Sequence, residues 1–153
     1  MTGLLGDWVA GWLGCWVARC LGTRHCACST TGMSLPHHSL IAWQRADDLF
    51  IDLHLLSRSF PPIERFELAS QFRRAAFSVP ANIAEGYGRH TTSDKLKFLQ
   101  IACGSLAEVG YCLHAARRLG YIEESVYGEF ELRVRKTSAP LRGLMKSMGR
   151  EHP

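Results

Sequence analysis

Residues 91–121, TTSDKLKFLQIACGSLAEVGYCLHAARRLGY, decide the fold. Apolar side chains recur through this stretch every three or four residues, which is the period of one face of an α-helix. The main stripe consists of Leu96, Leu99, Cys103, Leu106, Val109, Leu113 and Ala116, and it is widened by Phe98, Ala102, Ser105 and Cys112. A stripe this wide predicts the most buried helix of the protein and an all-α fold around it.

Both ends of this helix are also marked in the sequence. Residues 92–94 (Thr-Ser-Asp) offer a hydroxyl cap and an acidic side chain to the first turn, where free backbone N–H groups favour both. At the other end, Gly120 is placed for the left-handed conformation that closes many helices, with Tyr121 able to fold back. The helix is therefore predicted to end at Leu119.

The same period predicts two helices before this one. The first covers residues 39–58 and is stopped by Pro61 and Pro62, because proline has no N–H to continue the ladder. Its stripe is Trp43, Ala46, Phe50, Leu53 and Leu56. The second begins near Pro62 and ends at Gly86 and Gly88. Its stripe is Ile63, Phe66, Ala69, Phe72, Ala76, Val79, Ile83 and Tyr87.

Prolines inside two of the helices predict local distortion. We expect a kink at Pro80 in the second helix, since the apolar period continues past it. The last helix covers about 124–148, and Pro140 is expected to break or kink it, with Ser138 recapping the last piece. Its looser stripe is Val126, Phe130, Val134, Leu141, Leu144, Met145 and Met148. Four helices joined by short turns predict an up-down-up-down bundle.

The composition fits one mildly basic domain. The chain has 153 residues, a formal charge of +4 and a pI near 8.8, which permits a polyanionic partner without requiring one. From Met33 onward, 16 Lys and Arg stand against 13 Asp and Glu, a net charge of +3. Cys103 and Cys112 fall at apolar helix positions, so we expect buried free thiols in a reducing, cytoplasmic protein.

Residues 1–32 are predicted to be an extension outside the four-helix bundle domain, residues 33–153. Their apolar run, 8–18, is too short to span a bilayer, and no basic segment precedes it as in a secretory signal. The first interpretation is a disordered segment or one upstream of a true start at Met33, in which case residues 33–153 fold equally well alone.

Two other interpretations of the extension stay open. Trp8, Trp12 and Trp16 would share one face of an interfacial helix. A zinc site is the other, although its spacing is unlike a usual zinc knuckle; its ligands would be Cys20, His25, Cys26 and Cys28.

The sequence shows no catalytic set. It contains no Glu-x-x-His pair of a di-iron bundle, no phosphate-binding glycine loop and no serine in a nucleophile elbow. We therefore expect no enzymatic activity, no cofactor and no metal. A less favoured alternative is a metal site made of His54, Glu85, Glu108 and His114.

Basic side chains give the main functional indication. They flank the second helix and are in excess on the last one, where a solvated surface would also explain them. The functional interpretation is contact with phosphates, which suits the forked donors of arginine. The candidate nucleic-acid-binding residues are Arg65, Arg73, Arg74, Arg89, Arg133, Arg135 and Lys136.

Three polar residues interrupt apolar stretches and are predicted to have structural roles: Asn82, Glu85 and Glu108. The two carboxylates look buried in the sequence, where each could bind an arginine, such as Arg73 or Arg74, of a neighbouring helix or subunit. A structural ion pair or hydrogen-bonded cap is the favoured interpretation, and a functional site is the alternative.

Residues 71–89, QFRRAAFSVPANIAEGYGR, resemble the signature of the four-helix bundle family known from intervening sequences of bacterial large-subunit ribosomal RNA genes. Residues 42–46 (AWQRA), 98–108 (FLQIACGSLAE) and 119–122 (LGYI) extend the match. The positions that match the family motif are Arg73, Arg74, Asn82, Glu85, Gly86, Arg89 and Glu108.

The resemblance implies a left-handed bundle, assembly into a ring-shaped pentamer and no catalysis. A related branch is the accessory variability protein of diversity-generating retroelements, which binds nucleic acid and a reverse transcriptase. We expect a cytoplasmic homo-oligomer that binds RNA or DNA, with no membrane partner. The alternative is a structural adaptor for a protein partner such as a reverse transcriptase, and the sequence leaves open which of the two branches applies.

Overall fold

The computed structural model describes residues 35–149, which form four long helices and contain no strand. These are α2 (Ile41–Leu56), α3 (Leu68–Tyr87), α4 (Thr92–Arg118) and α5 (Glu124–Gly149). Three short 3-10 helices are η1 (Pro36–Ser39), η2 (Ser57–Ser59) and η3 (Pro62–Phe66). The predicted all-α four-helix fold is confirmed. The predictions for residues 1–32 lie outside the described residues.

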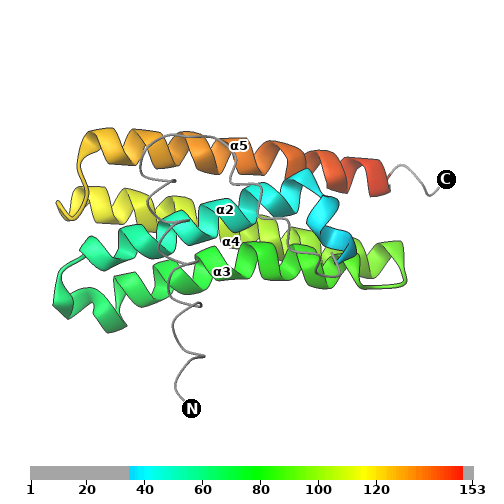
Figure 1. Cartoon of the computed structure of the whole chain (residues 1–153), viewed down its shortest axis with the longest axis horizontal. Coiled ribbons are helices and arrows are strands. Elements are labelled where there is room, and N and C mark those ends of the chain that lie inside the picture. The colour runs from blue at the N-terminus through cyan, green and yellow to red at the C-terminus, as the bar shows by residue number, and fades with distance from the viewer. Residues whose placement is uncertain (1–34, 150–153) are drawn as a thin grey trace, which may run out of the picture. The chain divides into compact units, whose positions relative to one another are not determined.

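Each long helix packs against two others. Helix α3 lies against α2 and α4, and α5 lies against α4 and α2, while the diagonal pairs make no close backbone approach. Figure 1 shows the four helices lying lengthwise side by side. Because short turns join consecutive helices, they run up-down-up-down. None of the helices in the described range is long and apolar enough to cross a membrane.

The core receives side chains from all four helices. The largest fully buried ones are Phe72, Leu53, Ile83, Leu99, Leu113, Leu141, Val79, Val109 and Thr137. Helix α3 buries eight of its 20 residues and α4 eight of its 27, so the prediction that α4 is the most buried helix is wrong. The reason is that one face of α4 stays in solvent, where Ile101 is 50% and Tyr111 71% exposed.

The predicted ends of α4 are confirmed, with a shift of one residue at the start. The hydroxyl cap is Thr91, whose Oγ1 accepts a 3.1 Å hydrogen bond from the backbone N–H of Asp94. At the other end Gly120 has a φ of 75°, the left-handed conformation. The Tyr121 N–H then folds back and donates to the carbonyl of Ala116 at 2.9 Å.

The start of the second predicted helix is wrong. Residues Pro62–Phe66 form the separate 3-10 helix η3, and the chain turns at Glu67 (φ −107°, ψ −112°) before α3 begins. This turn rotates Ile63 and Phe66 away from the core face, where they are 78% and 83% exposed.

Both internal prolines lie within continuous helices. Helix α3 runs through Pro80, which is buried, and α5 runs through Pro140, which is half-buried. Of the two outcomes expected at Pro140, the break and its recapping by Ser138 are therefore wrong, whereas the kinks at Pro80 and Pro140 stay predictions. Packing against neighbouring helices offsets the loss of one backbone hydrogen bond at each proline.

Candidate nucleic-acid interface

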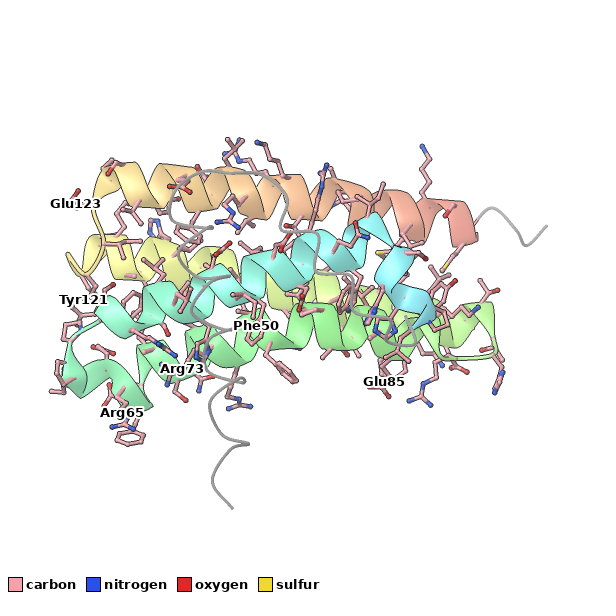
Figure 2. All side chains as sticks on the ribbon, in the orientation of Figure 1. Phe50, Arg65, Arg73, Glu85, Tyr121 and Glu123 are labelled. Atoms are coloured by element: carbon pink, nitrogen blue, oxygen red, sulfur yellow. The ribbon has the colours of Figure 1, made fainter. Side chains whose placement is uncertain are left out.

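The connection between α2 and α3 gathers basic side chains at one end of the bundle. Arg58 lies before the Pro61–Pro62 turn and Arg65 after it, and Arg73 lies in the second turn of α3. These three arginines line a pocket of about 460 Å³, here called the arginine pocket. Figure 2 shows Arg65 and Arg73 at the same end of the bundle. The remaining lining residues are His54, Ser57, Phe60, Pro61, Pro62 and Ala69.

Within the described part of the chain, no carboxylate lines the arginine pocket. Arg58 and Arg65 are exposed, and neither forms an ion pair within residues 35–149. The guanidinium of Arg65 lies 5.5 Å from the ring centroid of Phe66, a contact that leaves its N–H groups available. The pocket therefore presents unbalanced positive charge to solvent.

Arg73 is held in place by uncharged acceptors. Its Nη2 donates a 2.9 Å hydrogen bond to the carbonyl of Arg65, and its Nη1 donates to Ser57 Oγ at 3.4 Å. The Ser57 hydroxyl in turn donates to the carbonyl of His54 at 2.7 Å. A guanidinium has five N–H donors, so this half-buried side chain is oriented and still has donors for an anion.

Three other candidate nucleic-acid-binding residues lie outside the arginine pocket, and two of them pair with a carboxylate. Arg74 is exposed on α3. Arg89, at the far end of α3, pairs with Glu85 and lies 4.6 Å from the ring centroid of Phe98. On α5, Arg135 pairs with Glu131 at 3.0 Å.

Arg133 and Lys136 lie where α5 meets α2. Arg133 pairs with Asp52 and lies 5.3 Å from the ring centroid of Phe130. Lys136 is exposed and borders a smaller pocket of about 230 Å³ that also contains Asp48. Of the seven predicted basic residues, the structure thus brings only Arg65 and Arg73 together in the arginine pocket, while carboxylates neutralise Arg89, Arg133 and Arg135.

Sequence reasoning missed Arg58 and His54 as members of the site. The available signal was their position just before a proline pair, because a tight turn places the residues on its two sides at the same end of a bundle. His54 was considered only as a metal ligand, and the type of Arg58, on the polar side of a helix, gave no reason to single it out.

The two glutamates that interrupt apolar stretches, Glu85 and Glu108, differ from the sequence expectation. Both carboxylates are exposed in the chain, so the expectation that they are buried within it is wrong, although Glu85 does form an ion pair, with Arg89. Contact with an arginine of a neighbouring subunit stays a prediction. In this part of the bundle the neighbouring Gly86 takes the buried position against α4 instead.

Asn82 is half-buried and takes part in a contact between α3 and α4. Its Nδ2 donates to the carbonyl of Ser78 at 2.7 Å and to Ser78 Oγ at 2.9 Å. The Ser78 hydroxyl is 2.8 Å from that of Ser105 on α4. The three side chains are thus linked by hydrogen bonds inside the bundle.

The two cysteines of the bundle are free thiols. Cys103 Sγ lies 3.6 Å from Met145 Sδ, and Cys112 is buried. Burial raises the pKa of both thiols, which disfavours the nucleophilic thiolate at neutral pH. Within residues 35–149, no group of three or more His, Cys, Asp or Glu side chains could hold a metal ion.

Fold and site together define a four-helix bundle protein with a cationic pocket at one end. Residues 38–143 match the family model described as 23S rRNA-intervening sequence protein. The chain belongs to this family, which confirms the resemblance seen in its sequence.

One solved structure similar to this chain is that of a protein with unknown function from the S23 ribosomal protein family of Bacteroides thetaiotaomicron VPI-5482. It has a TM-score of 0.65 and 20% sequence identity, and the match covers 69% of this chain and 99% of that one. The two proteins share the fold. A comparison with curated proteins gave no match.

Proposed function

We propose that this protein is a non-enzymatic, cytoplasmic accessory protein that binds RNA or DNA through phosphate groups in the arginine pocket. The observation that carries the proposal is a pocket that, among the described residues, is lined by three arginines and no carboxylate. Two of these arginines are exposed without an ion pair in the same part of the chain, and the third is fixed by neutral acceptors.

Phosphate is the anion that best suits this arrangement. Guanidinium groups donate in pairs to phosphate oxygens, and charge-assisted hydrogen bonds of this kind are roughly twice as strong as neutral ones. The pocket is open to solvent, so it fits a phosphate on an extended chain better than an enclosed small ligand. The family is named for an intervening sequence of 23S rRNA, which makes RNA the first probe to test.

Assembly of several copies would strengthen such binding. One domain carries a net charge of only +3 from Met33 onward. A homo-oligomer, a pentamer by resemblance to the family, would repeat the arginine pocket around a ring. Several weak phosphate contacts on one polymer then act together, since each additional contact becomes intramolecular.

The test is fluorescence anisotropy of labelled structured RNA and duplex DNA with the full-length protein, across a salt series. We expect affinity to fall steeply with salt, because each phosphate contact releases condensed counterions. The double variant Arg58→Gln/Arg65→Gln should bind more weakly with a shallower slope. The matched control is Arg118→Gln/Arg142→Gln, which removes the same charge from exposed arginines outside the pocket.

Two results would contradict the proposal. One is the absence of binding to either probe at low salt. The other is an equal loss of affinity in the pocket variant and the control variant, which would mean that net charge alone, and not the arginine pocket, governs binding.

A second candidate function, a structural adaptor for a protein partner, is favoured by the solvent-facing side of α4. Ile101 and Tyr111 are 50% and 71% exposed there, and a Cβ added at Gly104 between them would meet no other atom within 4 Å. Exposed apolar side chains on one face are typical of a contact with another protein chain. Light scattering of Ile101→Asp and the wild type separates self-association from an adaptor role, because only self-association predicts a smaller mass for the variant.

A further inference from the structure

An aromatic strip adjoins the arginine pocket along the seam between α2 and α3. It consists of His54, Phe50 and Phe77. The ring centroids of His54 and Phe50 lie 6.0 Å apart, and those of Phe50 and Phe77 lie 5.7 Å apart. Because His54 also lines the pocket, the strip and the pocket form one continuous surface. Figure 2 shows Phe50 and Arg73 in neighbouring positions along the bundle.

Phe77 is the solvent-facing member of the strip. It is 58% exposed, whereas Phe50 is half-buried and supports it from α2 in an edge-on contact with an interplanar angle of 70°. Phe77 follows Arg73 by one helical turn, so the two side chains project from the same face of α3, about 6 Å apart along its axis. Arg73, whose guanidinium is held by Ser57 and the carbonyl of Arg65, and the exposed ring of Phe77 thus lie on one face of α3, one turn apart.

We infer that this surface binds single-stranded nucleic acid, with a phosphate in the arginine pocket and a neighbouring base stacked on Phe77. The inference rests on the proposed function and specifies its ligand. Single-strand binders combine a cationic groove that follows the backbone with aromatic side chains on which bases stack. In a duplex the faces of the bases are covered by their neighbours, so a surface ring such as Phe77 gains nothing from duplex binding.

The test compares three probes with the full-length protein by fluorescence anisotropy. The first is an oligouridine of about 12 nucleotides, a length in the range of known single-strand sites. The second is an abasic oligomer with the same number of phosphates, and the third is a duplex of the same length. We expect the oligouridine to bind roughly tenfold more tightly than the abasic oligomer, which is the magnitude of one base stacked on an aromatic ring.

Two variants test whether Phe77 causes the preference for oligouridine over the abasic oligomer. Phe77→Leu keeps an apolar side chain but removes the ring, and it should bring the two single-stranded probes to within about twofold of each other, because leucine offers no stacking surface. The matched control, Tyr87→Leu, removes an exposed ring from the last turn of the same helix and should leave the preference intact. A preference for oligouridine that survives in Phe77→Leu overturns the inference.

The remaining outcomes separate this inference from the proposed function. Salt-dependent binding of all three probes with equal affinity rejects the stacking site and leaves the phosphate site standing. Absence of binding by every probe at low salt rejects both. A lower molecular mass of Phe77→Leu in light scattering, with no change in probe preference, assigns the ring to a contact between copies of the chain and overturns the inference.

Discussion

Tyr121, in the turn between α4 and α5, and Glu64, in η3, are joined by a 2.8 Å hydrogen bond from the Tyr121 hydroxyl to Glu64 Oε1. The second carboxylate oxygen of Glu64 accepts a 3.1 Å hydrogen bond from the backbone N–H of Leu68, the first residue of α3. The ring of Tyr121 also lies 5.9 Å from that of Phe60, which lines the arginine pocket. One carboxylate therefore links the α4–α5 turn to the segment that carries Arg65.

This link predicts a stability effect at alkaline pH. The hydrogen bond to Glu64 raises the pKa of Tyr121 above its usual value, with burial as the next cause. The folded state thus holds the phenolic proton more tightly than the unfolded state, so the stabilisation is complete below the unfolded pKa, near 10, and is lost as pH rises through the folded pKa. We expect Tyr121→Phe to have a lower Tm than the wild type at pH 7, and we expect this difference to shrink as the pH rises above about 10. A difference in Tm that does not shrink as the pH rises above about 10 would contradict this account.

Two glycines on different helices predict opposite effects of the same substitution. A Cβ added at Gly86 would lie 3.0 Å from Phe98 Cβ and 3.2 Å from the carbonyl oxygen of Lys95, so α3 and α4 would have to separate. Overpacking of this kind costs about 1–3 kcal/mol and exceeds the gain in helix propensity of about 1 kcal/mol. Gly86→Ala should therefore lower the free energy of unfolding measured in urea.

The matched control is Gly128→Ala on α5, where an added Cβ meets no other atom within 4 Å. It should raise the free energy of unfolding by about 0.5–1 kcal/mol, because alanine has less backbone entropy to lose. An increase for both variants would show that α3 and α4 are not closely packed at Gly86.

The parts of the fold that could be predicted from the sequence are those fixed by local chemistry. The left-handed end of α4 at Gly120 needed only the identity of that glycine and the period before it. The separation of η3 from α3 at Glu67 was missed, because Ile63 and Phe66 continue the apolar period of α3. Periodicity records which residues are apolar, but it does not record where the chain turns. A break at Pro140 was one of two outcomes expected from the sequence, and it does not occur, since packing against neighbouring helices keeps α5 continuous.

The sequence indicated which type of side chain would make up the candidate site, but it did not indicate which arginines would lie together. Arginine was the expected phosphate ligand, and Arg65 and Arg73 do meet in one pocket. Arg133 was an equally strong candidate in the sequence, yet its partner Asp52 is 81 residues away along the chain. Only the packing of α5 against α2 shows that its charge is already balanced.

The Arg133–Asp52 pair predicts a measurable coupling between α2 and α5. Both side chains are half-buried, at 31% and 24% exposure, so the pair is less screened than a surface ion pair. A double-mutant cycle with Arg133→Gln and Asp52→Asn should give a coupling free energy of about 1 kcal/mol in urea unfolding. Additive effects of the two substitutions would show that the pair contributes nothing to stability.

The basic residues of α5 provide the last test of where phosphates bind. Arg135 already pairs with Glu131, and the small pocket that Lys136 lines also contains the carboxylate of Asp48, whereas among the described residues no carboxylate lines the arginine pocket. The variant Arg135→Gln/Lys136→Gln should retain a salt slope for structured RNA close to the wild-type value. In contrast, Arg58→Gln/Arg65→Gln should reduce the magnitude of that slope by about 1–2, roughly one for each phosphate that the variant no longer binds. Both variants remove two positive charges, so the comparison tests location and not net charge. A larger reduction of the salt slope for the α5 variant would show that the binding surface lies on α5 and not at the α2–α3 end of the bundle.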